Sequence, residues 1–491
     1  METKLVDFKE KYRPQFHFTP EENWMNDPNG LVYYQEEFHL FYQYHPRDNV
    51  WGPMHWGHAV SKDLVYWNHL PVAIEPDHNG AIFSGSIVVD KNDSSGFFNG
   101  EEGLVAIFTH ADTYPDSVRP RQRQSLAYSN DNGRSWEMYE ANPVLSNNKF
   151  SDFRDPKVYW LESHNKWIMV LVAGDHVRFY DSHNLKEWNY LSSFSEGSKK
   201  GVWECPDVFK LPVENESESK WILSVDLNPG GPQGGSGSQY FIGDFDGKKF
   251  INENSKDEIK WLDYGRDYYA AVSWNNIPEE DGRKLWIAWM SNWDYANEVP
   301  TTPWRSAMTI PRELKLKKDK QNYKLVQKPV AELKKIREEL FHCENRSIEK
   351  DENILAGIKA KSFEIKTDLN LKDCSDFNFT LRKGINERTI IGYNKKQNKF
   401  YLDRRNSGEN DFHDNFAEIH ELPLELNNDS LKLQIFVDWS SVEIFINSGE
   451  KTVTDLIFPK EESDSLELNV EKGTLKVNNL DLYKLDSIWR K

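Results

Sequence analysis

A short turn that ends in tryptophan recurs three times in the N-terminal part of the chain, and it constrains the fold more than any other feature of the sequence. Its copies occupy residues 61–67, 129–136 and 182–188, and each follows a short apolar stretch typical of a strand. The closing residues Trp67, Trp136 and Trp188 are 69 and 52 residues apart. Repeats of about 50 residues with about four strands each are typical of β-propeller blades. The repeat therefore predicts a propeller.

The sequence around these turns fits the same fold class. From residue 30 to about residue 325, short runs rich in β-branched and aromatic residues alternate with turn sequences, and no convincing helical period interrupts them. A region of about 300 residues at this spacing corresponds to five blades with insertions. The alternative is that the three turns resemble one another by chance.

The hydrophobic period changes after the expected propeller. Behind Pro329, the apolar residues Val330, Leu333, Ile336 and Leu340 lie three to four positions apart, which predicts a short amphipathic helix over 328–341. From about residue 345, evenly spaced alternating strands predict a β-sandwich. We therefore expect an all-β protein, a five-bladed β-propeller followed by a C-terminal β-sandwich. The expected divisions are a catalytic propeller over 1–327 with a leader over 1–15, a linker with the short helix over 328–344, and an accessory sandwich over 345–491.

Charge and composition exclude several function classes. The formal net charge of −18 argues against nucleic acid and anionic membrane as partners. Three cysteines without a Cys-x-x-Cys pair suggest neither a disulfide framework nor a metal site. The polar N-terminus lacks the apolar core of a signal peptide, so we expect a cytoplasmic protein, or a secreted one if the chain has been trimmed. The sequence leaves a homo-oligomer open.

Three acidic residues stand in unusual surroundings, each close to the start of a predicted strand. Asp27 lies in Trp-Met-Asn-Asp-Pro-Asn-Gly, Asp155 in Phe-Arg-Asp-Pro and Glu204 in Trp-Glu-Cys-Pro. Blade strands that run outward from a propeller axis can bring such residues together at one end of the channel. For each acid alone, a surface or turn carboxylate is the simpler interpretation. The three together, with flanking Trp, Arg and Pro, favour a shared site.

The flanking residues suggest different tasks for the three acids. Glycoside hydrolysis needs two carboxyl groups that flank the scissile bond, and the group acting as acid must keep its proton near neutral pH. Trp203 and Cys205 offer Glu204 an apolar wall that would raise its pKa, and we expect Cys205 to pack there rather than to act as a nucleophile. Arg154 is expected to keep the neighbouring Asp155 ionised.

These motifs resemble those of glycoside hydrolase family 32, the invertases, levanases, inulinases and fructan exohydrolases. The resemblance covers residues 16 to about 316, and a C-terminal stretch, 438–445, resembles the strand pair of the family's second module. Further matching stretches are residues 51–58, 83–86, 234–236, 264–270, 291–293 and 303–306. The resemblance implies a five-bladed propeller plus a β-sandwich, in agreement with the repeat.

The resemblance also implies a role for each matching residue. Asp27 would be the nucleophile, Glu204 the general acid/base and Asp155 the transition-state stabiliser of a retaining exo-β-fructosidase that forms a covalent fructosyl-enzyme. Retaining geometry predicts that the two reacting carboxyl groups lie about 5–5.5 Å apart. Residues implied to bind the fructosyl ring, or to lie near it, are Trp24, Asn26, Gln43, Trp51, Phe83, Ser84, Arg154 and Trp293.

The implied substrates are sucrose or the β-fructans levan and inulin, and neither a cofactor nor a metal is expected. Three alternatives stay open. The same site could transfer fructose to a sugar, a related five-bladed fold with three acids serves inverting pentosidases, and a sugar-binding propeller could have lost catalysis. The presence of all three acids argues against the last of these.

Overall fold

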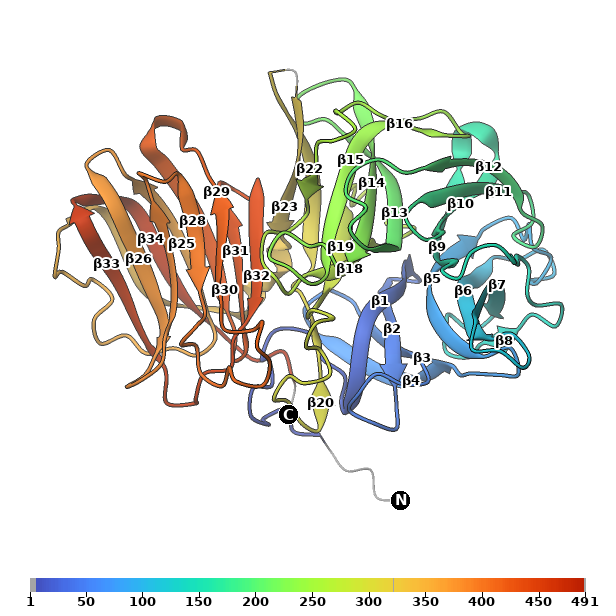
Figure 1. Ribbon diagram of the computed structural model, residues 1–491, viewed down its shortest axis with the longest axis horizontal. Helices are drawn as coiled ribbons and strands as arrows, with labels where there is room; N and C mark the ends of the chain where they lie inside the picture. Colours follow the sequence, from blue (N-terminus) through green and yellow to red (C-terminus); the bar gives the residue numbers. More distant parts are fainter. Residues whose placement is uncertain (1–5, 321, 490–491) are drawn as a thin grey trace.

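A computed structural model describes residues 6–320 and 322–489, and it consists almost entirely of β-strands. Five sheets follow one another around a ring, and two further sheets face each other beside it (Figure 1). The ring is the predicted five-bladed β-propeller and the sheet pair is the predicted β-sandwich, so the expected fold class is confirmed. Among the described residues, no helix has both the length and the apolar run that a bilayer crossing requires.

Each blade is an antiparallel sheet whose first long strand lies nearest the ring axis. The first blade contains β1 (Asn23–Tyr34), β2 (Glu37–His45), β3 (His55–Ser61) and β4 (Trp67–Ile74). The second contains β5 (Ala81–Asp90), β6 (Gly103–Thr113), β7 (Pro120–Ser129) and β8 (Glu137–Met138). The third contains β9 (Arg154–Leu161), β10 (Lys166–Val172), β11 (Val177–Ser182) and β12 (Asn189–Phe194), with a 3₁₀ turn, η1 (Glu162–His164), after β9.

The last two blades close the ring. The fourth contains β13 (Val202–Pro212), β14 (Ser219–Asn228), β15 (Gly237–Phe245), β16 (Phe250–Asn252) and β17 (Lys260–Trp261). The fifth contains β18 (Tyr269–Ser273), β19 (Lys284–Met290), β21 (Ala307–Met308), β22 (Arg312–Asp319) and β23 (Asn322–Pro329). Between β19 and β22 the chain returns to the first blade, where β20 (Trp304–Arg305) pairs in parallel with β1. This pairing joins the end of the ring to its start.

The tryptophan-ending repeat marks the outer edge of three successive blades. Its copies connect β3 to β4, β7 to β8 and β11 to β12. In each copy one side-chain oxygen accepts hydrogen bonds from two backbone N–H groups of the turn. The side chains are Asp63, Asp131 and Asn184. Asp and Asn favour turns because they make such local hydrogen bonds. The fourth blade has the same kind of turn between β15 and β16. There Asp246 accepts hydrogen bonds from two backbone N–H groups, and Phe250 stands in the place of the tryptophan.

The sandwich packs one six-stranded sheet against one five-stranded sheet. The strand order of the first sheet is β24 (Arg337–Ile348), β34 (Leu475–Leu485), β25 (Phe363–Asn370), β30 (Ser430–Val437), β31 (Ser441–Ile446) and β32 (Lys451–Leu456). The strand order of the second sheet is β29 (Ile419–Pro423), β28 (Lys399–Asp403), β27 (Thr389–Asn394), β26 (Cys374–Lys383) and β33 (Ser465–Gly473). A 3₁₀ segment, η3 (Asn427–Asp429), precedes β30. Alternating apolar residues of both sheets form one continuous core between them.

The helix expected over 328–341 is wrong in kind and in length. Pro329 ends β23, a single 3₁₀ segment η2 (Ala331–Ile336) follows, and β24 begins at Arg337. The apolar spacing is real, because Leu333 and Ile336 are buried. Pairing with β34 draws the second half of the segment into a strand, so tertiary contacts override the local period. We propose that the sandwich begins at β24 rather than at residue 345.

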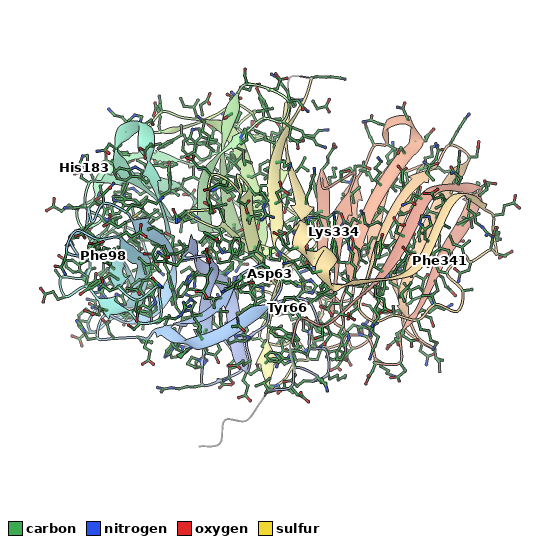
Figure 2. The ribbon with its side chains drawn as sticks, turned by 180° about the vertical axis from the view of Figure 1, so that it is seen from behind. Asp63, Tyr66, Phe98, His183, Lys334 and Phe341 are labelled. Carbon is green, nitrogen blue, oxygen red and sulfur yellow. The ribbon has the colours of Figure 1, made fainter. Side chains whose placement is uncertain are left out.

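The two domains meet along the first and fifth blades. Figure 2 shows Asp63, Tyr66 and Lys334 close together at this junction. There Lys335 of η2 donates to Asp63, at 2.9 Å, in the repeat turn of the first blade. A buried ion network adds to the junction, since Arg312 of β22 donates to Glu443 of β31 at 2.5 Å. The linker is therefore held against the propeller.

Candidate active site

The three predicted acids lie on the inner strands of three different blades, each at or beside a β-bulge that carries a proline. Asp27, Asp155 and Glu204 lie near the starts of β1, β9 and β13. In each strand the pairing register skips at these positions. The following prolines, Pro28, Pro156 and Pro206, have no N–H to donate, which favours bulges there. Because a bulge redirects the neighbouring side chains, the same local device serves all three blades.

Asp27 is buried and held by several hydrogen-bond donors. Ser84 donates to one carboxylate oxygen at 2.7 Å, and the Asn26 amide donates to the other at 3.0 Å. The Cys205 thiol lies 3.4 Å from the oxygen that Ser84 contacts. Donors on two sides fix the orientation of the carboxylate. The carboxylate is thus positioned for a reaction at one point in space.

Arg154 contacts Glu204 more closely than its neighbour Asp155. The guanidinium donates to Glu204 at 2.9 Å and to Asp152 at 2.5 Å, whereas its nearest nitrogen lies 3.8 Å from Asp155. The Tyr269 hydroxyl donates to the second oxygen of Glu204. Both oxygens of Glu204 therefore have partners from other blades.

Asp155 is not kept ionised in the way the sequence suggested. Its burial raises the pKa of the carboxyl to about 7, and the attraction of Arg154 does not compensate, because Glu204 and Asp27 add repulsion. The Cys205 backbone N–H, at 3.0 Å, supplies one hydrogen bond to the carboxylate. The expectation failed because it considered only the adjacent residue and not the desolvation of the site.

Replacing Asp155 with asparagine is expected to stabilise the protein increasingly as the pH rises. Between pH 3.8, the ordinary pKa of an aspartate, and about pH 7, the unfolded chain ionises Asp155 while the folded protein keeps it protonated, so the folded protein loses stability as the pH rises. Asparagine carries no such penalty. The stability difference should grow from pH 4 to pH 7 and level off at about 2–4 kcal/mol above it. Thermal unfolding of both proteins across this range measures it.

The exposed Asp244→Asn change is the control for that experiment, since this side chain is 59% exposed. It should show no comparable dependence on pH. An Asp155→Asn difference that stays constant from pH 4 to pH 8 would contradict the raised pKa.

Trp203 and Cys205 do not form the apolar wall expected beside Glu204. Trp203 is fully buried in the core between the third and fourth blades, and its indole donates to the Ser198 carbonyl. Neighbouring residues of a strand point to opposite faces, so Trp203 cannot line the Glu204 side chain. Cys205 likewise contacts Asp27 and Asp155 rather than Glu204. Burial raises the pKa of its thiol well above the usual value, so the thiol keeps its proton and can donate.

The remaining predicted residues surround the acids at different depths. Trp24 is fully buried, donates to Asn26 at 2.7 Å and lies 6.0 Å from Trp293, with the two rings stacked. Phe83 packs against the same cluster and meets the ring of Trp51 edge-on at 6.2 Å. Trp51, 46% exposed, is the most open of these aromatics. The aromatic side chains beside the acids thus range from the fully buried Trp24 to the exposed Trp51.

Gln43 also lies in this region and is buried. Its amide donates to the Ile82 carbonyl at 3.0 Å, next to Phe83 and Ser84. Among the described residues its side-chain oxygen, which can accept a hydrogen bond, has no donor. All eight predicted binding residues therefore come from the first, second, third and fifth blades, around the same end of the channel.

Two residues of the site had no role in the sequence interpretation. Tyr269 lies in the matching stretch 264–270, but nothing in its spacing indicated a contact with Glu204. Asp226 of β14 lies opposite Glu204 of β13 in the strand register. It is buried and accepts a hydrogen bond from Ser238. Burial raises the pKa of Asp226 well above its usual range, and the three predicted acids add to the effect. A fourth carboxyl group thus lies behind the site.

Two family models together match almost the whole chain. The model for the glycosyl hydrolases family 32 N-terminal domain matches residues 17–329, and the model for the glycosyl hydrolases family 32 C-terminal part matches residues 332–484. These ranges correspond to the propeller and to the sandwich with the preceding η2 segment.

Known proteins of similar sequence and structure agree with this match. A levanase of Bacillus subtilis (strain 168) is 52% identical over 98% of this chain and 72% of its own length. An extracellular exo-inulinase of Aspergillus awamori is 38% identical over 99% of this chain and 97% of its own.

The crystal structure of exo-inulinase from Aspergillus awamori superposes with a TM-score of 0.91 at 37% identity, over 98% of this chain and 100% of that one. A fructofuranosidase from Schwanniomyces occidentalis complexed with fructose superposes with a TM-score of 0.88 at 34% identity, over 99% of this chain and 100% of that one. On the two family matches and these similarities, the chain is a member of glycosyl hydrolase family 32.

Proposed function

We propose that this protein is a retaining exo-β-fructosidase that releases terminal β-D-fructofuranosyl residues from sucrose or from β-fructans such as levan and inulin. The observation that carries the proposal is the set of three carboxyl groups joined through Arg154 and Cys205 at one end of the propeller channel. The names levanase and exo-inulinase among the relatives support hydrolysis of fructans. They favour hydrolysis over fructosyl transfer or simple sugar binding.

In this mechanism Asp27 attacks the anomeric C2 of the terminal fructose. Glu204 donates its proton to the leaving oxygen, and the C2–oxygen bond breaks as the bond to Asp27 forms. Glu204 then takes a proton from water, whose oxygen attacks C2 and releases fructose and Asp27. Retention predicts that the carboxyl groups of Asp27 and Glu204 lie about 5–5.5 Å apart, and a wider spacing would indicate inversion.

The neighbouring residues are assigned supporting roles in the same proposal. Asp155, near its pKa at neutral pH, would hydrogen-bond the hydroxyl groups of the fructosyl ring, and Arg154 would hold Glu204 in place. Asn26, Gln43 and Ser84 have the donors and acceptors that sugar hydroxyls need. The aromatic residues Trp24, Trp51, Phe83 and Trp293 would shape the pocket, with Trp51 offering the exposed stacking face.

Product analysis tests the proposal. The protein is incubated separately with sucrose, inulin and levan, and free fructose is followed by chromatography. Fructose as the only product of the fructans is expected. Longer fructose-containing products would instead indicate transfer or endo cleavage, and no release from any substrate would contradict the proposal.

The relatives bear on where the protein acts. The cytoplasmic location expected from the polar N-terminal residues finds no support among the relatives, since the Aspergillus awamori exo-inulinase is named extracellular. Levan and inulin are polymers that an exported enzyme can reach. We therefore favour an exported protein.

A further inference from the structure

A second pocket lies at the opposite end of the propeller channel from the three acids. Its volume is about 880 Å³. The far ends of the inner strands line it, for example Val88 in β5, Tyr159 in β9 and Phe209 in β13. Tyr159 follows Asp155 by four residues, which corresponds to about 13 Å along the strand. His183, which also lines the pocket, lies at the outer edge of the propeller, far from the domain junction (Figure 2).

A buried ion pair separates this pocket from the catalytic end. Lys157, two residues after Asp155 on β9, lies 3.3 Å from Asp207 and donates to the Ser273 carbonyl at 2.6 Å. Lys157 and Asp207 are both buried. Lys157 lines a small cavity beside Asp155 and Cys205, whereas Ser273 lines the second pocket, so the pair lies between the second pocket and the acids.

Cations without partners face this pocket. In the described part of the chain, Lys284 has no hydrogen bond or ion pair, and its ammonium only lies 5.4 Å from the centre of the Phe209 ring. Burial, and next the charge of Lys157, lower the pKa of Lys284 to about 8, and the attraction of Asp207 offsets only part of this shift. Lys91 and Lys210 at the rim are exposed and, among the described residues, likewise have no carboxylate partner. Three unpaired lysines at one pocket contrast with the formal net charge of −18.

The acidic side chains of the pocket are already engaged by the protein. Asp90 is fully buried and accepts hydrogen bonds from the backbone N–H groups of Ser94 and Ser95. Glu162 accepts the indole N–H of Trp160 at 2.7 Å. Neither is within ion-pair distance of Lys284. Asp207, whose charge attracts Lys284, is already paired with Lys157. Lys284 therefore has no ion-pair partner of its own, and an anion bound beside it would stabilise its charge.

Aromatic rings form much of the remaining wall. Tyr159 and Trp221 lie with their ring centres 5.7 Å apart, and Trp160 and Phe209 also line the pocket. The Tyr159 hydroxyl is buried and has no hydrogen-bond partner among the described residues. Aromatic faces suit the apolar face of a sugar ring. The volume lies in the range of small-molecule pockets and is too large for an inorganic anion alone.

We propose that this pocket binds a phosphate monoester of a monosaccharide, with the phosphate held by Lys284 and the rim lysines and the sugar ring against the aromatic wall. Lysine binds phosphate as a point charge, and several lysines can share one dianion. This site is independent of the fructosidase activity proposed for the opposite end of the channel.

Calorimetric titration of the whole protein with fructose 6-phosphate, fructose and inorganic phosphate tests this proposal. Fructose 6-phosphate is expected to bind more tightly than either of the other two. Lys284→Met should weaken its binding by about tenfold or more, because a charge-assisted contact is lost. Lys210→Met should weaken it by a smaller factor, and Lys284→Arg, which keeps the charge, should retain most of the affinity.

The matched control is Lys396→Met, which removes an exposed lysine of the sandwich and should leave binding unchanged. Sucrose hydrolysis should be unaffected in all four variants, and this also verifies that each of them folds. Equal binding by the Lys284→Met protein would overturn the proposal, because the ligand would then occupy another site. Equal affinity for fructose or for inorganic phosphate, or no binding of fructose 6-phosphate, would overturn it as well.

Discussion

Replacing Asp27 with asparagine is expected to lower kcat for sucrose or levan by at least about 10⁴-fold, because the amide cannot attack C2 and form the fructosyl-enzyme. The change preserves size, and the amide oxygen can still accept a hydrogen bond from Ser84 or Asn26. Substrate binding and thermal stability should therefore change little. Steady-state kinetics of fructose release measures the effect, and calorimetry with the unreacted substrate measures binding.

Asp244→Asn is the matched control for this experiment as well, because it makes the same chemical change at an exposed position of the fourth blade. Its turnover should equal that of the parent protein. If the Asp27→Asn protein kept more than about a tenth of the parent turnover, Asp27 would not be the nucleophile, and the assignment of all three acids would have to be revised.

Replacing Arg312 with methionine is expected to destabilise the protein by about 3–5 kcal/mol, since breaking a buried ion pair leaves the partner charge uncompensated. Arg312 is fully buried and donates to Glu443 at 2.5 Å and to Asp263 at 3.1 Å. Glu443 also contacts His17 at 2.9 Å. Burial alone would lower the pKa of His17, but hydrogen bonds to Asp438 and Glu443 outweigh it and raise the pKa to about 9. The network thus joins the N-terminal segment, the fifth blade and the sandwich.

Differential scanning calorimetry of the Arg312→Met protein measures this effect and also shows whether the two domains begin to unfold separately. In the double variant Arg312→Met/Glu443→Gln, the charge of Glu443 is removed together with that of Arg312. This variant should recover part of the stability that the Arg312→Met protein loses. Kinetics of fructose release at low temperature should remain close to those of the parent, because Arg312 contacts none of the three acids. A loss below about 1 kcal/mol would show that the network is not important for stability.

The features predicted well from sequence are those set by neighbouring residues. Asp63, Asp131 and Asn184 each bond to the backbone N–H groups of their own turn, so the repeat is visible without any knowledge of the fold. The proline-bearing bulges beside Asp27, Asp155 and Glu204 are equally local, and they explain why three short motifs suffice to locate the acids. Alternation of apolar residues in the sandwich strands has the same local origin.

The features predicted poorly depend on partners far away in the sequence. Residues 328–341 have a helical apolar period, yet β34 supplies hydrogen-bond partners that make the second half a strand. Arg154 was expected to hold the adjacent Asp155, yet its closer site partner is Glu204, 50 residues later in the chain. Tyr269, the other partner of Glu204, comes from yet another blade.

The sequence by itself determined the class of fold, the number of blades and the three acids proposed for the site, because turns, bulges and strand alternation arise from interactions between near neighbours. Only the tertiary structure decided which cation pairs with which carboxylate, how far burial raises the pKa of Asp155, and where unpaired lysines collect at the far end of the channel. These properties depend on distances between blades and on exclusion of water, and both exist only once the ring has closed.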